Sequence, residues 1–316
     1  MRRYLGQRLL FAGVSLLGLT VLVFVFLRAV PGDAVAQVLG ESAGSSPQQV
    51  AELRHTLHLD DPLPVQYVRW IGDLLHGDMG RSIFTGHTVI YEIRERIGAT
   101  FELAILALLF SVLFGLPLGV VSAMAGNAIV RQVVRITSIL GLALPNFWIG
   151  TMVIVFGVRW FGWAPPTQYR SITDHPLQNL EQFIIPALVV GVGLAASLSR
   201  MTRSTVLEVR REDYIRTAFA KGLKNRTILM RHILRTSMIP VVTLFAIQVG
   251  IVVAGAVVIE NVFSLPGSGR LILDSISKKD YPLVEGVILL YGIFIIFVNL
   301  LTDLVYCLLD PRVRLA

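Results

Sequence analysis

The sequence has little charge and almost no cysteine. Only 16% of its 316 residues are charged, whereas 54% are hydrophobic, and its mean hydropathy is +0.69. A water-soluble core cannot hold that much apolar sequence, which excludes an ordinary soluble protein. The single cysteine, Cys307, excludes an internal disulfide and a zinc site made of cysteines.

Patterns typical of nucleotide-binding and catalytic sites are also missing. No Gly-x-x-x-x-Gly-Lys-Ser/Thr loop occurs, and the glycines of residues 265–270 lack the required lysine. His55, His76 and His87 fit no compact metal site. No His-Glu-x-x-His, Gly-x-Ser-x-Gly or paired intramembrane aspartate pattern is present. We therefore expect no catalytic residue, metal or cofactor in this chain, and ATP hydrolysis would have to come from a partner.

Long uncharged runs are what the sequence has instead. Residues 9–27 form such a run directly after Arg2, Arg3 and Arg8, and as a helix it is long enough to cross a bilayer. A secretory signal peptide with a cleavage site at residues 34–36 is the alternative, but the run exceeds the usual signal core. Further apolar segments predict five more spans, near residues 102–125, 133–158, 184–203, 238–259 and 286–309.

The predicted architecture is an all-α polytopic membrane protein with about six transmembrane helices. Residues 1–29 would hold the N-terminus and the first helix, and residues 101–316 a five-helix core. Residues 30–100 contain proline, glycine, histidine and charges of both signs, so we expect a partly helical extracytoplasmic insertion there.

The distribution of Lys and Arg supplies a separate test of this topology. With a cytoplasmic N-terminus, six spans place both chain termini and the segments 126–135 and 200–237 inside. These inside segments hold 17 Lys and Arg in about 62 residues, against 11 in about 122 outside residues. The net charge of +7 therefore has a topological explanation, and we expect a lipid bilayer and no nucleic acid as partner.

The basic segment 200–237 is longer than two adjacent spans need. Within it, Ile215, Ala218, Phe219 and Leu223 follow a spacing of i, i+3, i+4 and i+8, which predicts a short helix with one apolar stripe. This is the shape of a docking element, although a basic amphipathic helix lying on anionic lipid has a similar composition.

The ends of this helix carry their own signals. Glu212 and Asp213 fall in its first turn and Lys221 in its last, as the helix dipole favours. Gly222 can take the left-handed position that ends the helix. Asn225 is expected to be the N-cap of a second helix that continues into the membrane.

Residues 212–223, followed by His232 and Pro240, resemble the cytoplasmic "EAA" loop of ABC importer permeases of the peptide and nickel subgroup. The resemblance has two departures, both typical of the peptide subgroup. Residues 216–218 are Arg-Thr-Ala instead of Glu-Ala-Ala, and Pro240 lies farther from the glycine than in sugar importers. Other stretches that are similar to this subgroup lie at residues 31–33, 76–80, 260–267, 280–284 and 310–312.

This resemblance implies an importer with two homologous permease subunits, expected to be a heterodimer, two ABC ATPase subunits that use ATP and Mg, and an extracytoplasmic solute-binding protein. The chain would be one permease in the cytoplasmic (inner) membrane of a prokaryote. Its coupling loop, residues 204–237, would present a short helix to an ATPase. The docking residues that the resemblance implies are Glu212, Asp213, Tyr214, Arg216, Thr217, Ala218, Phe219, Ala220, Lys221, Gly222 and Leu223.

Polar residues and prolines inside the predicted spans are further candidates. Gln248, Asn299 and Asp303 are expected to line a pathway or to hold helices together, because polar groups in lipid seek the bundle interior. Pro117 and Pro145 interrupt the second and third predicted spans, where they could serve a gate or simple packing.

Peptides are the predicted cargo, and nickel chelates, glutathione or another small solute are the alternative within the same architecture. A membrane-embedded protease, and an exporter or passive channel, are hypotheses of other classes. Substitution of Gly222 separates them, because only a permease coupled to an ATPase needs this corner for transport.

Overall fold

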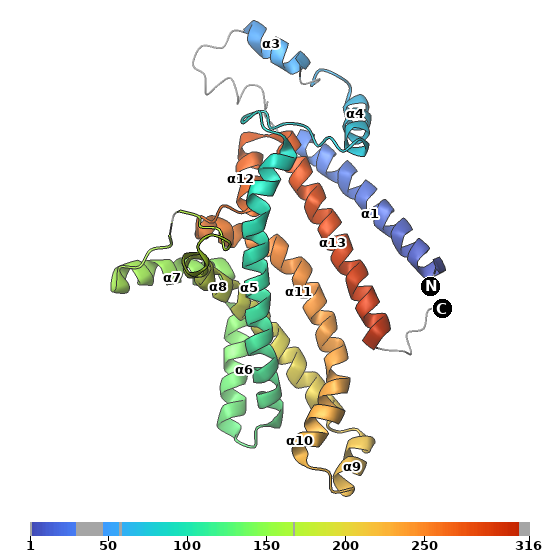
Figure 1. Ribbon diagram of the computed structural model, residues 1–316, viewed down its shortest axis with the longest axis vertical. Helices are drawn as coiled ribbons and strands as arrows, with labels where there is room; N and C mark the ends of the chain where they lie inside the picture. Colours follow the sequence, from blue (N-terminus) through green and yellow to red (C-terminus); the bar gives the residue numbers. More distant parts are fainter. Residues whose placement is uncertain (1, 30–46, 57–58, 167, 310–316) are drawn as a thin grey trace. The chain divides into compact units, whose positions relative to one another are not determined.

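The computed structural model describes residues 2–29, 47–56, 59–166 and 168–309 of the chain. These residues form helices joined by turns and loops, and their only β-type pairing is an isolated bridge between Arg81 and Thr88 (Figure 1). The helices are α1 (Arg2–Ala29), α3 (Pro47–Thr56), α4 (Leu63–Leu75), α5 (Val89–Met124), α6 (Ala128–Ala143), α7 (Asn146–Phe161), α8 (Pro176–Val209), α9 (Asp213–Ala220), α10 (Asn225–Thr227), a π-helical turn (Ile228–Ile233), α11 (Leu234–Val262), α12 (Ser268–Lys278) and α13 (Tyr281–Leu309). The predicted all-α fold class is confirmed.

Within the described residues, five stretches of helix are long and apolar enough to cross a membrane: one each in α1, α5, α8 and α13, and one that runs from α10 through α11. The pair α6 and α7 supplies a sixth span if its two halves are counted together, and they are bent by 97° at the break between them. The bend has a local cause. Leu144 has an extended backbone, as a residue before proline prefers, and Pro145, also extended, directly precedes the first residue of α7. The interruption expected at Pro145 is therefore real.

Two details differ from the sequence prediction. Pro117 does not interrupt the second span, since α5 continues through it. The same helix begins at Val89, thirteen residues before the predicted start at residue 102. Its first turns are polar and contain an ion pair between Glu92 and Arg96, four residues apart. The helix thus extends beyond the apolar run that the hydropathy detects.

By its contacts the chain divides into two compact units. Unit 1 comprises residues 1–98 and 266–296, and unit 2 comprises residues 99–265 and 297–316. Most of α12 and α13 thus belongs with the N-terminal part, whereas the domain boundaries expected from the sequence stay a prediction.

Unit 1 joins the C-terminal end of α1 to α4 and α13. Phe24 of α1 makes ring contacts with Tyr67 and Trp70 of α4, with centroids 5.2 and 6.0 Å apart. Arg28 of α1 donates a hydrogen bond of 2.6 Å to Glu285 of α13, and both side chains are largely buried. The ion pair connects residues that are 257 positions apart in the chain, and the attraction between the two charges offsets the desolvation cost of burying them.

Unit 2 is built on close approaches between helices. A Cβ atom at Gly119 of α5 would lie 2.7 Å from the carbonyl oxygen of Ser199 of α8, and one at Gly115 would lie 2.9 Å from that of Ala195. Small residues at this spacing allow two helix backbones to pack closely without a hydrophobic driving force from water. Close backbone approach therefore joins α5 to α8, and no larger residue fits at Gly119 without a shift.

Candidate docking site

Helix α9 ends at a left-handed glycine corner, as the sequence predicts. Gly222 has φ of +75°. Its N–H donates to the carbonyl of Phe219 at 2.9 Å, and the N–H of Leu223 donates to the carbonyl of Ala218 at 3.3 Å. This pair of bonds is the Schellman arrangement, which satisfies carbonyls that the end of a helix leaves unpaired. The direction of the chain after α9 is thus fixed by its backbone.

The second helix of the loop starts one residue earlier than expected. Lys224 has extended backbone angles and precedes α10, so Asn225 is the first helical residue and the prediction that it is the N-cap was wrong. The chain then passes through the π-helical turn before α11 begins. Such single π turns insert one extra residue per turn and are frequent at functional sites.

The predicted apolar stripe of α9 divides into two parts. Ile215 and Ala218 are buried, with Ile215 completely inaccessible, whereas Phe219 and Leu223 keep 45% and 39% of their surface exposed. The predicted apolar stripe therefore has a buried half, Ile215 and Ala218, and an exposed half, Phe219 and Leu223. The helix has about two turns, from Asp213 to Ala220, and its buried residues are Ile215 and Ala218.

The buried part of the stripe contacts three spans. Ile215 and Ala218 belong to one hydrophobic cluster with residues of α5, α8 and the π-helical turn: Ala123, Val206, Val209, Ile228 and Ile233. A displacement of α9 would be passed to all of these helices because the cluster is close-packed. Figure 1 shows α9 and α10 side by side at one end of α11.

The outer part of α9 is open to a partner. Tyr214 is 44% exposed, and its hydroxyl donates to Oγ1 of Thr236 at 3.3 Å. Arg216 and Asp213 form an ion pair at 3.3 Å, but their side chains are 76% and 94% exposed, so the pair contributes little to stability. Thr217, Ala220, Lys221, Gly222 and Leu223 are exposed as well. Two aromatic rings on a rigid, exposed helix are a typical surface for protein recognition.

A polar cleft of about 490 Å³ lies beside the start of α9. Its lining includes Glu208, Arg211, Glu212 and Asp213. Glu212 precedes α9 with an extended backbone and makes no side-chain cap bond. The acidic residues of an otherwise basic loop therefore gather at the first turn of α9, where the helix dipole favours negative charge.

Gln248 serves packing in this structure. Only 2% of it is exposed, its Nε2 donates to the carbonyl of Leu194 at 2.9 Å, and its Oε1 accepts from Oγ of Ser111 at 3.1 Å. It thereby joins α11 to α8 and α5. Asn299 lies on an exposed part of α13. Asp303 lies in the same helix, but its side chain is outside the described residues.

Some buried charges escaped the sequence interpretation. Glu260, near the end of α11, is completely buried and accepts a hydrogen bond of 2.6 Å from Thr100 of α5. Arg28 and Glu285 form the buried pair of unit 1. A charged residue at the end of an apolar run was the available signal for each of them, since charges near lipid are expected to be paired.

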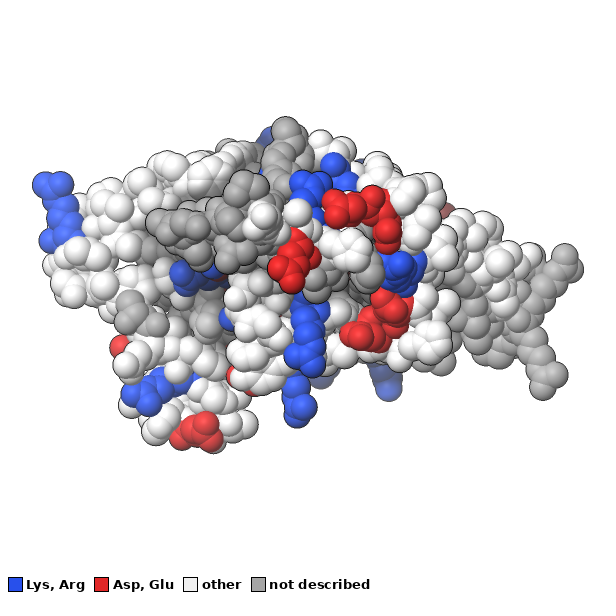
Figure 2. Space-filling view, turned by 90° about the horizontal axis from the view of Figure 1, so that it is seen from above, with Lys and Arg blue, Asp and Glu red and all other residues white. Residues whose placement is uncertain are grey.

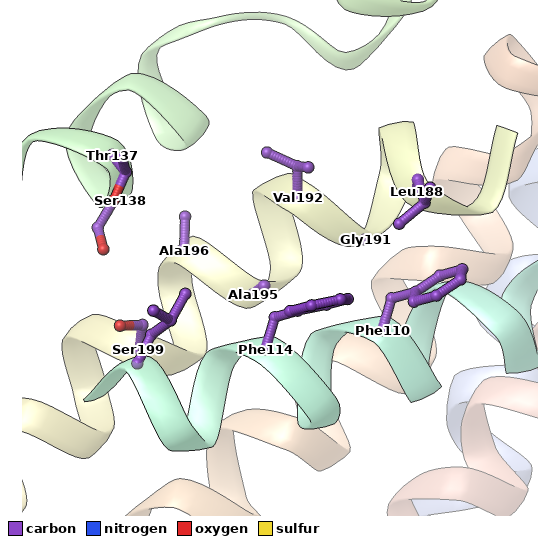
Figure 3. A pocket seen from close by; sticks show the side chains of 11 residues that line it. Phe110, Phe114, Thr137, Ser138, Leu188, Gly191, Val192, Ala195, Ala196 and Ser199 are labelled. Carbon is purple, nitrogen blue, oxygen red and sulfur yellow. The ribbon is translucent and has the colours of Figure 1, made fainter. Parts of the chain in front are cut away.

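An apolar groove of about 300 Å³ runs between α5, α6 and α8 (Figure 3). Phe110 and Phe114 of α5 line one wall with stacked rings, 6.1 Å between centroids. Thr137 and Ser138 of α6 face it, but their hydroxyls donate to carbonyls of their own helix. The groove therefore offers contacts to apolar side chains and no charge.

The charged side chains of the described residues form mixed pairs and no cluster of metal ligands. Among the described residues, no group of three or more His, Cys, Asp and Glu could hold a metal ion. Figure 2, which looks onto the molecule from above, shows basic and acidic side chains interspersed over the coloured surface. In unit 1, for example, Arg69 pairs with Asp61 at 2.7 Å.

Comparison with known proteins places the chain in a family. Residues 115–315 match the binding-protein-dependent transport system inner membrane component, and residues 1–89 match the N-terminal part of the same membrane component. The chain belongs to this family. It is an inner membrane permease component of an ABC transport system, as the residues of its coupling loop predicted.

Curated relatives match this permease over its whole length. It is 38% identical to the di/tripeptide transport system permease protein DppB of Pseudomonas aeruginosa, with 99% of both chains covered. It is 37% identical to the dipeptide transport system permease protein DppB of Escherichia coli and to a putative peptide permease of Brucella suis, again over 99% of both chains.

Solved structures show the same fold at much lower identity. A chain of the MetNI methionine ABC transporter, in inward-facing conformations, is 17% identical with a TM-score of 0.54, over 70% of this chain and 97% of that chain. A chain of an amino acid ABC transporter is 13% identical with a TM-score of 0.55, over 69% and 94%. The permease thus has the fold of ABC transporter membrane subunits.

Proposed function

We propose that this permease forms half of the translocation pathway of an ATP-driven importer of peptides. The support for peptide cargo is the set of relatives named as di/tripeptide, dipeptide and peptide permeases, which match from end to end at 37–38% identity. A solute-binding protein would deliver the peptide, and a second, homologous permease would complete the pathway. Both chain termini would lie in the cytoplasm, following the charge distribution.

The observation that carries the ATP-driven mechanism is the division of α9 into a buried edge and an exposed face. Ile215 and Ala218 fix the helix to the spans, while Tyr214 and Phe219 point outward with nearly half of their surface exposed. In our proposal the exposed face lies in a groove of an ABC ATPase, and Arg216 and Lys221 lie at the polar rim. ATP and Mg would bind to the ATPases and not to this chain.

The packed contact between α9 and the spans would let the ATPases move the spans. When two ATPases close on ATP, they displace α9, and the close-packed cluster around Ile215 transmits the displacement to α5, α8 and α11. The π-helical turn between α10 and α11 is the element with irregular hydrogen bonding on this route. The spans would thereby switch between outward and inward access.

A pair of alanines on α9 gives a sharp test of docking. The natural cysteine Cys307 is replaced by serine, and a single cysteine is placed either at Ala220, which is exposed, or at Ala218, which is 7% exposed. In the complex purified in mild detergent, a short bifunctional thiol reagent should join the cysteine at 220, and not that at 218, to an ATPase subunit. Equal crosslinking of both, or of neither while ATPases are present, contradicts docking through this face.

The cargo is tested separately. ATPase activity of the complex is measured with its solute-binding protein and, in turn, dipeptides, longer peptides, nickel chelates and glutathione. Stimulation by peptides alone supports the proposal, and stimulation by nickel chelates or glutathione instead favours the alternative cargo. Isolation of the chain without any ATPase would favour the channel or protease hypotheses.

A further inference from the structure

Three buried oxygen atoms on the neighbouring helices α5 and α8 have no hydrogen-bond donor among the described residues. They are Oε1 of Glu102, Oδ1 of Asn179 and Oε1 of Gln182, and each exposes less than 1 Å². Asn179 is completely inaccessible, and Gln182 is 3% exposed. A buried acceptor without a donor has lost its hydration and gained no bond in return, so it calls for a ligand. The transport mechanism proposed above uses none of these side chains.

Two carbonyls of the loop between α7 and α8 fix the orientation of both amides. Nδ2 of Asn179 donates to the carbonyl of Arg170 at 2.9 Å, and Nε2 of Gln182 donates to the carbonyl of Pro166 at 3.1 Å. Turning either amide over would place its oxygen against a carbonyl oxygen, so these contacts determine which atom is oxygen and which is nitrogen. Both amide oxygens therefore point away from the loop carbonyls.

The carboxylate of Glu102 lies beside the face of α8 that carries the two amides. Asn179 and Gln182 are three positions apart and are thus neighbours on the helix surface. The side chain of Asn179 interacts with the carboxylate of Glu102. Burial and the negative charge of Glu102 both raise the pKa of the Tyr169 hydroxyl, so the loop before α8 lies close to the same charge. The ring of Tyr169 also contacts that of Phe183 edge-on, with centroids 6.2 Å apart.

The number and charge of these oxygens indicate the class of ligand. A proton on Glu102 would satisfy one amide oxygen and leave the other without a donor. A water molecule would balance no charge, and the ammonium group of a peptide needs an opening that these inaccessible oxygens do not offer. A metal cation can bind all of them, since carboxylate and amide oxygens are typical ligands of hard cations.

A single positive charge suits the site better than two. One carboxylate balances one charge, whereas a divalent ion would leave a buried excess of positive charge. Asn179 also lies close to the start of α8 at Pro176, where the helix dipole is already positive. The surroundings therefore favour a monovalent cation.

We propose that Glu102, Asn179 and Gln182 form a binding site for a monovalent metal cation of the class of Na⁺ or K⁺. The carboxylate supplies the counter-charge. The carbonyls of Pro166 and Arg170 each have a second lone pair, so they and water would complete the coordination. The cation would join α5 to α8 and to the loop before α8. The proposal is independent of the cargo and of ATPase docking.

The probes are radioactive sodium and rubidium ions, the latter as an analogue of potassium. Their retention by the full-length chain is measured in detergent by scintillation proximity, in a buffer of choline chloride. We expect saturable retention of at least one of the two ions. Glu102→Gln should weaken it by about tenfold or more, because loss of a ligand costs at least as much affinity as loss of a residue that supports one. The matched control is Glu181→Gln, since Glu181 is an exposed residue of the same helix α8; it should retain the ion like the natural protein.

Thermal unfolding distinguishes a cation from a proton at Glu102. The midpoint of the natural protein should rise when the preferred ion replaces choline at equal ionic strength, because the ion binds the folded state, whereas that of Glu102→Gln should not respond. Gln182→Met keeps the carboxylate and removes one oxygen, so it should raise the ion concentration needed for half-saturation. Glutamine imitates a protonated Glu102, so a proton at this site predicts that neither protein retains an ion and that neither midpoint responds. That result overturns the proposal, as does equal retention by Glu102→Gln or a stronger response of the natural protein to Ca²⁺ than to either monovalent ion.

Discussion

Replacement of Gly222 by alanine should weaken the coupling of ATP hydrolysis to peptide transport. The φ of Gly222 is +75°, and a Cβ atom added there meets nothing within 4 Å. The cost therefore comes from the backbone alone and is about 1–2 kcal/mol for a residue with a side chain in the left-handed region. An energy of this size lowers the population of the corner by a factor of about 5–30 relative to competing conformations.

The assay is the ATPase activity of the purified complex, stimulated by the binding protein and a dipeptide. Gly222→Ala should reduce the stimulated rate about fivefold or more, with the complex still assembled as judged by size-exclusion chromatography. The stimulated rate of Gly222→Asn should lie between that of Gly222→Ala and that of the natural protein, because asparagine adopts the left-handed conformation more easily than alanine. Gly126→Ala is the matched control, since its Cβ also meets nothing within 4 Å and its φ is not positive. Full activity of Gly222→Ala would refute the argument that the corner directs α9.

Other substitutions test the remaining elements. Ile215→Ala should lower the free energy of unfolding by about 2–5 kcal/mol, because Ile215 is fully buried, and should uncouple ATP hydrolysis from transport. Phe219→Ala should leave the thermal stability of the isolated chain unchanged, because Phe219 is exposed, but less of the ATPase should stay bound to the permease during purification. Gly119→Leu should lower the midpoint of thermal unfolding, measured in detergent, because its Cβ alone would already lie 2.7 Å from the carbonyl oxygen of Ser199; an unchanged midpoint would mean that α5 and α8 separate at no cost. Burial raises the pKa of the Asp280 carboxyl despite its bond from Ser82, so the stability contributed by this group is complete below its unfolded pKa and is lost as pH rises through the folded pKa. Asp280→Asn should therefore gain stability relative to the natural protein as pH rises, and a gain that grows toward acid pH would contradict this sign.

The sequence was informative where a signal was local. Apolar runs located the spans, the apolar spacing from Ile215 to Leu223 predicted the short helix, and Gly222 predicted its left-handed end. Proline at position 145 indicated the break in the third span, although its angle of 97° depends on how α6 and α7 pack. The extension of α5 back to Val89 was missed because its first turns are charged and resemble a loop in a hydropathy profile.

Contacts between residues far apart in the chain could not be predicted from a single sequence. The buried pair of Arg28 and Glu285 joins residues 257 positions apart, and no local pattern connects them. Which edge of α9 is buried depends on the position of α8 and the π-helical turn, so the stripe of Ile215 and Phe219 could not be divided from spacing alone. Gln248 could line a pathway or pack, and only its bonds to Ser111 and Leu194 distinguish these roles.

The central claim is that this permease imports peptides at the expense of ATP hydrolysed by partner subunits. The most direct measurement is uptake of a radiolabelled dipeptide into proteoliposomes that contain the purified complex, with ATP enclosed and the binding protein outside. The account predicts uptake that requires ATP, Mg and the binding protein and that falls with Gly222→Ala. Uptake that proceeds without ATP, or a fully assembled complex that hydrolyses ATP in response to its binding protein and moves no peptide, would contradict it.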